Sequence, residues 1–223
     1  MNVSFHANLM QQPQQEPLLL KIPFGNTADH FFKDLHEKTL TAGTPFEFDG
    51  GFSSMIYGGI VYNSENLNVA ANNQKYKENM YNTIYLSGLY RDILSQIRQY
   101  FPVHYLLMFR SAACIAYLET NKQYPSRIVP VNSWHTDCTE KIEQTDVPLR
   151  VTLCTYNNME GRIITNYNHH GKIHTFNLQP EQAVLFDRRT PHKITYIPPL
   201  ERTLPNTKRI VLILDFLRRC SFL

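Results

Sequence analysis

The sequence predicts a mainly β protein in which a helical N-terminal part packs on a C-terminal β-barrel or sandwich. From Val103 onward, short apolar runs alternate with turn residues, which is the strand spacing of all-β folds. Before Pro102, residues 76–100 repeat apolar side chains at helical intervals of three and four. The 13 Tyr and 13 Phe residues also favour sheets, because aromatic side chains fit pleated surfaces.

The elements before this helix are expected to be short. Residues 1–17, which are rich in Gln and Pro towards their end, predict an irregular lead-in. A short strand should follow from Leu18 to Pro23. A capped helix should come next and end near Gly43, and the glycines and asparagines of residues 43–74 predict loops and short strands.

The C-terminal part contains nine apolar runs of strand length. In order they are VHYLLMF, AACIAYL, RIVPV, RVTLCTY, RIIT, IHTFNL, AVLF, KITYI and RIVLILDF. We therefore interpret the chain as one domain with three parts. These are the lead-in 1–17, an N-terminal helical and mixed part 18–102 that packs on the barrel, and a β core 103–223.

Bulk composition sets few limits on function. The net charge of +3 neither requires nor excludes a polyanion, so a nucleic-acid partner is not indicated. The four cysteines form no CxxC pair, which favours free thiols in a cytoplasmic protein. The N-terminus does not have the pattern of a signal peptide, and no apolar run approaches the ~20 residues that span a bilayer. We expect no membrane insertion.

Three residues have the pattern of a metal site. His135 and Asp137 are two residues apart, so on a strand they point the same way, and His192 lies on a later run. Two imidazoles and one carboxylate form the facial triad of non-haem Fe(II) oxygenases, which leaves coordination positions open. An isolated HxD is common by chance, and by itself it indicates a strand end with a hydrogen-bonded His. The order of the segments that follow it favours the metal site.

The segment from about Tyr117 to Phe216 resembles the double-stranded β-helix core, a jelly-roll or cupin-like barrel, of 2-oxoglutarate/Fe(II) dioxygenases, including the prolyl-hydroxylase-like group. PLRVTLCTYNNMEGR is similar to a strand and tight turn of that family, and AVLFDRRTPHKI to the strand that delivers the distal His. WHTD, LRVTLCTY, the Pro-His element and KRIVLILD together also resemble a bacterial family of uncharacterised proteins. The resemblance implies Fe(II), with 2-oxoglutarate as cosubstrate.

The resemblance also implies an arginine for the far carboxylate of 2-oxoglutarate, which a guanidinium binds bidentately. In the family it comes from the strand after the distal His, and Arg209 opens that strand here. Arg209 lies 17 residues after His192, a longer gap than is usual. The proline-containing insert IPPLERTLPNT accounts for the extra length, and Arg202 within it is the alternative anchor.

Two tyrosines resemble family positions whose hydroxyls bind the cosubstrate. Tyr156 ends the strand RVTLCTY, and Tyr124 precedes His135 by eleven residues. Strand alternation predicts that Tyr156 shares a face with Arg150 and Cys154. The alternative for each tyrosine is a barrel-wall aromatic whose hydroxyl is hydrogen-bonded within the protein.

Other polar clusters are expected to be solvated. Gly171 indicates a hairpin turn, and the histidines around it do not have a common zinc spacing. Cys138, beside the metal motif, is expected to be a packing residue. The expected solvated residues are His169, His170, His174, Arg188, Arg189, Arg218 and Arg219. For Arg188 and Arg189, which precede His192, the alternative is contact with an anionic substrate at the entrance of the site.

The sequence thus supports the hypothesis of an Fe(II)- and 2-oxoglutarate-dependent dioxygenase. It would hydroxylate or demethylate its substrate and release succinate and CO2. The alternatives are a cupin-type metalloenzyme that does not use 2-oxoglutarate and a non-catalytic metal-binding barrel. The substrate is unknown: a protein side chain, a nucleobase or a small metabolite.

Overall fold

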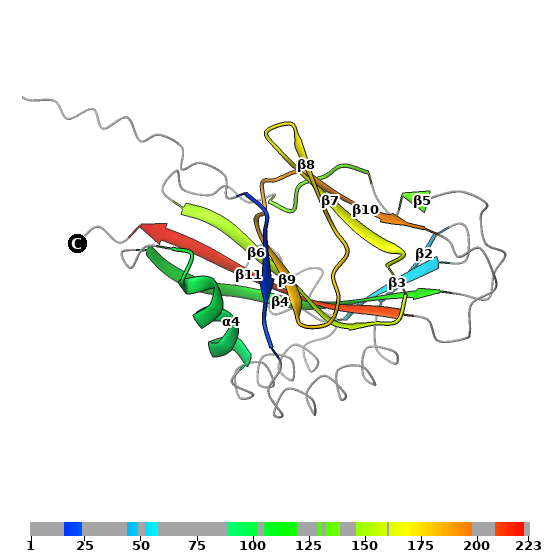
Figure 1. Ribbon diagram of the computed structural model, residues 1–223, viewed down its shortest axis with the longest axis horizontal. Helices are drawn as coiled ribbons and strands as arrows, with labels where there is room; N and C mark the ends of the chain where they lie inside the picture. The colour runs from blue at the N-terminus through cyan, green and yellow to red at the C-terminus, as the bar shows by residue number, and fades with distance from the viewer. Residues whose placement is uncertain are drawn as a thin grey trace, which may run out of the picture.

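Two antiparallel β-sheets form the protein, and Figure 1 shows their arrangement in a computed structural model. The structure describes residues 16–23, 44–48, 52–57, 89–101, 105–119, 129–130, 133–138, 146–159, 161–197 and 208–220. The predicted mainly β fold is confirmed in these segments. The predicted helix before Gly43 and the first half of the predicted helix 76–100 lie outside them.

The larger sheet has seven strands in the order β1-β9-β6-β11-β4-β3-β2. Their bounds in that order are Leu18–Lys21, Gln182–Asp187, Asp146–Asn157, Lys208–Cys220, Tyr105–Glu119, Phe52–Tyr57 and Thr44–Phe48. Strand β4 is continuous where the sequence predicted two separate runs. Strands from the N-terminal part, β1 and β3, pair with β9 and β4, so they extend the same sheet.

The smaller sheet has four strands in the order β5-β10-β7-β8 and faces one side of the larger sheet. Its strands span Val129–Pro130, His192–Tyr196, Ile163–His169 and Lys172–Phe176. Strands β7 and β8 form the hairpin that was predicted at Gly171. The turn has positive φ angles at His170 (50°) and Gly171 (85°), a conformation that glycine adopts without strain.

One helix is present in the described segments, α4 at Leu89–Arg98, which confirms the second half of the predicted helix. Its buried residues, Ile93 and Ile97, are four apart and therefore lie on one face of the helix. That face packs on the side of the larger sheet away from β7, β8 and β10 (Figure 1). No described helix has the length and hydropathy that crossing a membrane requires.

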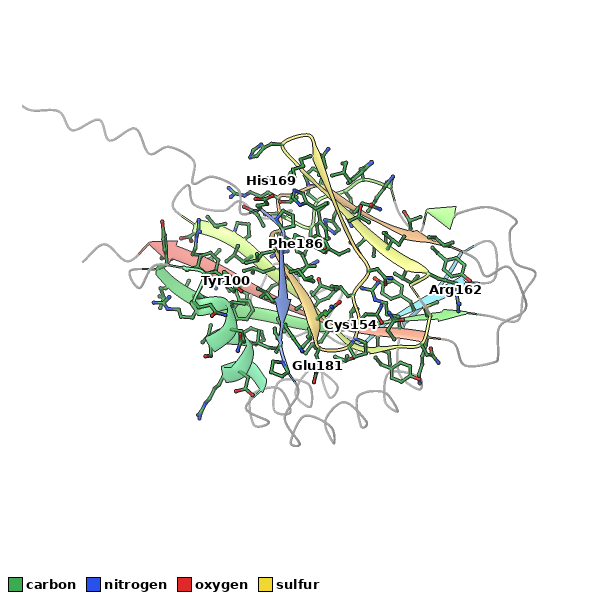
Figure 2. All side chains as sticks on the ribbon, in the orientation of Figure 1. Tyr100, Cys154, Arg162, His169, Glu181 and Phe186 are labelled. Atoms are coloured by element: carbon green, nitrogen blue, oxygen red, sulfur yellow. The ribbon has the colours of Figure 1, made fainter. Side chains whose placement is uncertain are left out.

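Strand alternation divides the core into two layers. The helix-side cluster consists of Leu20, Ile22, Ile93, Ile97, Phe101, Leu107, Val147, Leu149, Val151, Leu153, Ala183, Leu185, Ile210, Leu212, Leu214 and Phe216. The barrel cluster, between the two sheets, consists of Tyr117, Cys154, Met159, Ile163, Tyr167, Leu178, Val184, Phe186, Tyr196 and Val211. Figure 2 shows Cys154 and Phe186 within this space. Both faces of β6, β9 and β11 are therefore buried, which explains their nearly continuous apolar sequences.

Candidate metal centre

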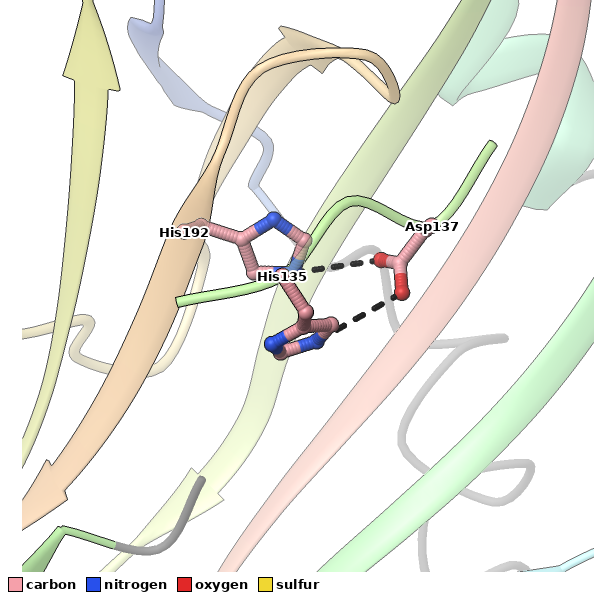
Figure 3. Close-up of side chains that lie close together, drawn as sticks. All are labelled: His135, Asp137 and His192. Atoms are coloured by element: carbon pink, nitrogen blue, oxygen red, sulfur yellow. Dashed lines mark ion pairs between the residues drawn. The ribbon is translucent and has the colours of Figure 1, made fainter. Parts of the chain in front are cut away.

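The side chains of His135, Asp137 and His192 come together, as Figure 3 shows. One ligand atom from each residue lies within 4.8 Å of the other two. His135 Nε2 lies 3.7 Å from Asp137 Oδ1, and His192 Nε2 lies 3.2 Å from Asp137 Oδ2. Two imidazole nitrogens and one carboxylate oxygen at such spacing are a donor set that suits a divalent transition metal.

The backbone sets the spacing of the two histidines. His135 and His192 form an antiparallel bridge in which each N–H donates to the carbonyl of the other, at 3.0 and 2.9 Å. Residues paired in this way project their side chains to the same face of the sheet. The imidazole rings are accordingly 4.4 Å apart.

Backbone carbonyls also orient the imidazoles. His135 Nδ1 lies 2.9 Å from the Ser133 carbonyl oxygen, and His192 Nδ1 lies 3.2 Å from that of Thr190. A carbonyl accepts, so each hydrogen bond requires its proton on Nδ1. In a ring that bound a metal, the lone pair would then be on Nε2, the atom directed at Asp137; without a metal, the hydrogen bond from His192 to Asp137 requires a proton there.

Asp137 is held in its ionised form. Burial by itself would raise the pKa of its carboxyl group. The hydrogen bond from His192 and the charge of Arg150 outweigh burial, and the pKa lies well below its ordinary range. A carboxylate that is ionised at neutral pH can ligate a metal without first releasing a proton.

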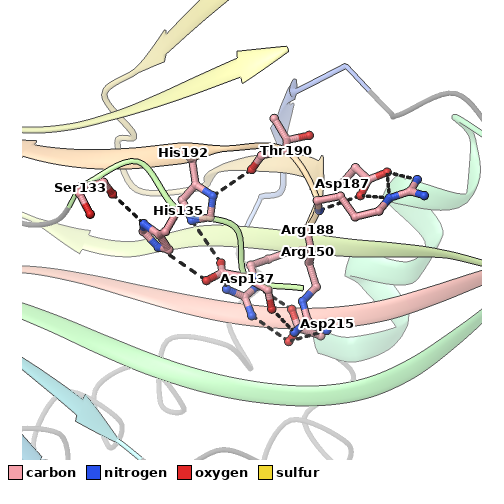
Figure 4. Close-up of polar contacts among 10 residues, drawn as sticks. Ser133, His135, Asp137, Arg150, Asp187, Arg188, Thr190, His192 and Asp215 are labelled. Atoms are coloured by element: carbon pink, nitrogen blue, oxygen red, sulfur yellow. Dashed lines mark hydrogen bonds and ion pairs between the residues drawn. The ribbon is translucent and has the colours of Figure 1, made fainter. Parts of the chain in front are cut away.

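An ion-pair network surrounds Asp137 (Figure 4), and the sequence did not reveal it. Arg150 donates to Asp137 Oδ2 and, through Nε and Nη2, to both oxygens of Asp215 at 2.6 and 3.0 Å. Arg188 donates to the Asp137 carbonyl oxygen at 2.7 Å. Its side chain is only 12% exposed, so the prediction that Arg188 is solvated was wrong. The neighbouring Arg189 does not join this network and pairs instead with the carboxylate of Asp187.

Arg209 lies inside the barrel. It is 1% exposed, and its Nη1 donates to the Ile163 carbonyl oxygen at 3.2 Å. Its Nε is buried without a hydrogen-bond partner, and no carboxylate of the described segments pairs with it. A buried cation is costly unless it is paired. An anionic group that entered the barrel could pair with this guanidinium.

Tyr167 interacts both with the Arg209 guanidinium and with His192, one of the three potential metal ligands. It lies opposite His192 in the smaller sheet, and the two rings stack at 5.6 Å. Burial raises the pKa of Tyr167, and the charge of Arg209 only partly offsets the effect, so its hydroxyl stays protonated. Tyr117, whose ring lies 5.9 Å from the Arg209 guanidinium, belongs to the same barrel cluster. Neither tyrosine stands in a motif that drew attention in the sequence.

The predicted position of Tyr156 was wrong. The register between β6 and β11 shifts so that Ile210 pairs with Tyr156 and Val211 with Cys154. Such a bulge reverses the alternation, and Tyr156 packs against the helix-side cluster rather than into the barrel. Tyr124 and Arg202 lie outside the described residues, so their predicted roles stay predictions.

Two side chains that were predicted to be solvated, His174 and Arg218, are largely buried. His170 is exposed, but the His174 side chain is only 13% exposed and lies 3.3 Å from Glu16. In the described segments, neither residue belongs to a metal-binding group. Arg218 is 7% exposed and stacks on the rings of Phe101 and Tyr105, so the prediction that it is solvated was wrong.

Both cysteines near the site are free thiols. Burial raises the pKa of the Cys154 thiol, and the charge of Arg209 only partly offsets this. A protonated, buried thiol is chemically inert, which agrees with a packing role. Cys138 is half-buried beside the metal cluster but is not a member of it.

Comparisons with known proteins agree on the fold. No family model matches the sequence, and no curated protein matches it. Among solved structures, a 2OG-Fe(II) oxygenase family oxidoreductase from Burkholderia pseudomallei is 11% identical, with a TM-score of 0.53 over 90% of this chain and 83% of that one. The non-heme alpha ketoglutarate dependent epimerase SnoN from nogalamycin biosynthesis is 9% identical, with a TM-score of 0.56 over 90% and 76%.

AviO1 from Streptomyces viridochromogenes is 10% identical, with a TM-score of 0.54 over 93% of this chain and 92% of that one. At such identities the likeness establishes the fold alone. The chain has the double-stranded β-helix fold of the 2-oxoglutarate/Fe(II) oxygenases, which confirms the fold that the sequence resemblance implied.

Proposed function

We propose that the protein is an Fe(II)- and 2-oxoglutarate-dependent oxygenase that hydroxylates or demethylates its substrate. His135, Asp137 and His192 would hold the iron, and Arg209 would bind the far carboxylate of 2-oxoglutarate. When bound, the iron and its cosubstrate supply oxidative chemistry that uses dioxygen and yields succinate and CO2. A structure of SnoN contains Fe3+ and alpha ketoglutarate, and this similarity of fold supports the same pair of ligands here.

The observation that carries the proposal is the fully buried Arg209 in the same barrel as the three potential ligands. A cation enclosed without a counter-ion is destabilising by several kcal/mol. A dicarboxylate that enters the barrel would supply that counter-ion with one end and reach the metal with the other. A metal-binding barrel that used no acidic cosubstrate would have no need of this arginine.

The residues around the site have separate tasks. The carbonyls of Ser133 and Thr190 fix the imidazole tautomers, so Nε2 is ready to bind metal. The Tyr167 hydroxyl stays protonated and can donate to a carboxylate near Arg209. The intact carboxylate at Asp137 argues against halogenation, because in that related chemistry a small residue takes its place so that halide can bind.

Anaerobic titration with Fe(II), with and without 2-oxoglutarate, tests the proposal. Chelation of bound Fe(II) by the 2-oxo acid end should give a visible charge-transfer band that neither component gives alone. If Fe(II) binds and no band forms, the function is that of a metalloenzyme that does not use 2-oxoglutarate. If the band forms but succinate is never released in air with candidate substrates, a non-catalytic barrel is favoured.

A ligand variant tests the metal assignment separately. The His135→Ala, Asp137→Ala double variant should lose stoichiometric metal, because a single remaining imidazole holds an ion poorly. Elemental analysis measures this directly. A Cys138→Ser variant is the matched control and should retain full occupancy. Full occupancy in the double variant would refute the assignment of the site.

A further inference from the structure

The Arg150 guanidinium bridges two carboxylates that come from different parts of the chain. Its Nη1 donates to Asp137 Oδ2, and its Nε and Nη2 donate to both oxygens of Asp215. Arg150 on β6 and Asp215 on β11 are direct cross-strand partners at the centre of the larger sheet. Asp137 lies in the segment 133–138, outside the named strands. The rigid pair can therefore position the more peripheral carboxylate.

Burial makes these contacts strong. The side chains of Arg150 and Asp215 are 15% and 7% exposed, and that of Asp137 is 21% exposed. Charge-assisted hydrogen bonds gain strength when water is largely excluded, and a bidentate fork adds geometric specificity. The two-point contact with Asp215 fixes the plane of the guanidinium, and so fixes where Nη1 meets Asp137.

The charges around the proposed metal are also balanced by this network. Arg150 by itself would offset the negative charge of Asp137 and repel a divalent cation. Asp215 offsets Arg150 in turn, so the Asp137 charge remains available to the metal. Arg188 joins the same network, since its Nη1 is 3.9 Å from Asp215 Oδ2 and its Nη2 donates to the Asp137 carbonyl oxygen.

We infer that Arg150 and Asp215 are positioning residues for the metal-ligating carboxylate of Asp137. Arg150 occupies Oδ2, so Asp137 is limited to ligation through one oxygen and does not chelate the metal with both. A carboxylate that binds through one oxygen leaves one more coordination position for the cosubstrate and dioxygen. Asp215 acts through Arg150. This inference rests on the proposed metal site.

The same two strands offer a matched control. Asp146 on β6 and Arg219 on β11 are also direct cross-strand partners. Arg219 Nε and Nη2 contact the Asp146 carboxylate at 2.9 and 2.7 Å, and Asp146 is 3% exposed. Asp146→Asn therefore removes a buried, fork-bound carboxylate from the same sheet, and among the described residues this carboxylate makes no hydrogen bond or ion pair with the potential metal ligands.

The test is calorimetric titration of the metal-free full chain with Co(II), which is stable in air. Asp215→Asn should raise the dissociation constant roughly 10–100-fold, the usual effect of removing an outer-shell partner. Asp146→Asn should leave it about unchanged, although both variants lower the thermal midpoint of the apoprotein. In an Arg150→Gln background, Asp215→Asn should lose most of its effect, because the charge it compensates is gone.

The measured Co(II) affinities distinguish failure of this inference from failure of the proposed function. Equal affinities of Asp215→Asn and Asp146→Asn for Co(II), or an Asp215 effect that persists without Arg150, would overturn the inference. If Asp215→Asn does not fold, Arg150→Lys replaces it, since lysine keeps the charge but has no fork. Unchanged Co(II) affinity and visible absorption in Arg150→Lys would also overturn it. Failure of the unmodified protein to bind Co(II) would instead refute the proposed function.

Discussion

At the scale of single residues, a substitution of Arg209 should weaken cosubstrate binding and leave metal binding nearly unchanged. Arg209→Met should raise the dissociation constant for 2-oxoglutarate by about two decades or more, because breaking a buried charge pair costs ~3–5 kcal/mol. Fe(II) affinity should stay nearly the same, since Arg209 is not in the metal cluster. Anaerobic calorimetry of the Fe(II)-loaded variant measures both.

Lys208→Met is the matched control for that variant. Lys208 is the adjacent residue, and its ammonium group lies over the Tyr156 ring at 5.4 Å rather than in the barrel cluster. The Lys208→Met variant should bind 2-oxoglutarate about as tightly as the unmodified protein. An equal loss in both variants would show that the start of β11, and not the Arg209 guanidinium, is what matters.

The lowered pKa of Asp137 makes a prediction about acid stability. A carboxyl group whose pKa is depressed by folding stabilises the protein above its unfolded value of about 3.9, and this contribution is lost as the pH falls further. The metal-free protein should therefore exceed Asp137→Asn in free energy of unfolding by a margin that is fully present at about pH 5.

Below about pH 4, that margin should shrink, because the unfolded chain then binds a proton at Asp137 that the native protein still excludes. Urea unfolding of the two metal-free proteins at several pH values measures the difference, and all other carboxylates are common to both. A margin that grows as the pH falls below about 4 would contradict the assigned direction of the pKa shift.

Local patterns predicted some of these residues and could not predict others. His135 and Asp137 are two apart, so their shared direction follows from strand geometry alone. Arg150 and Asp215 are 65 residues apart, and their contact depends on β6 pairing with β11. Tyr156 was misplaced because a single irregularity in strand register, which sequence alternation does not reveal, reverses the face.

At the scale of elements, helix α4 should contribute to stability and not to metal binding. Ile97 is fully buried in the helix-side cluster, on the opposite side of the larger sheet from the barrel. Ile97→Ala should cost about 2–5 kcal/mol of unfolding free energy through lost contacts and the cavity that remains. Its Co(II) affinity, measured well below the thermal midpoint, should be unchanged.

The exposed Gln99, just beyond the same helix, is the control position. Gln99→Ala should change stability by about 0.5 kcal/mol or less. Helical periodicity predicted this element because its two buried isoleucines are local in sequence. It could not predict which face of which sheet the helix covers, because that depends on strands β6 and β11, which come later in the chain.

Strand β11 carries residues of both proposed sites in the barrel, the cosubstrate site and the metal site. Arg209 at its start and Asp215 six positions later lie on its barrel side, with Val211 and Ile213 between them. At about 3.3 Å per residue, this spaces the proposed cosubstrate anchor and the metal-positioning carboxylate along one rigid element. In the sequence, the apolar run RIVLILDF predicted the strand and the family resemblance implied the role of Arg209, but no pattern pointed to Asp215.

At the scale of the whole molecule, metal binding should stabilise the fold by mass action. A ligand that binds only the native state adds about 2.7 kcal/mol at a hundred times its dissociation constant. For a chain of 223 residues, this corresponds to a rise in thermal midpoint of roughly 5–10 °C. Calorimetric melting with and without Co(II) measures it. The His135→Ala, Asp137→Ala variant should show no such rise.

The mutual hydrogen bonds between His135 and His192 have a consequence for how this centre could change over time. Both bonds join backbone groups only, so they do not depend on which side chains the two positions carry. In such a pair the Cα atoms stay about 5.5 Å apart whatever the residues are. Ligand chemistry at these positions is therefore free to diverge, by mutation or by design, while the scaffold that spaces the ligands is inherited intact.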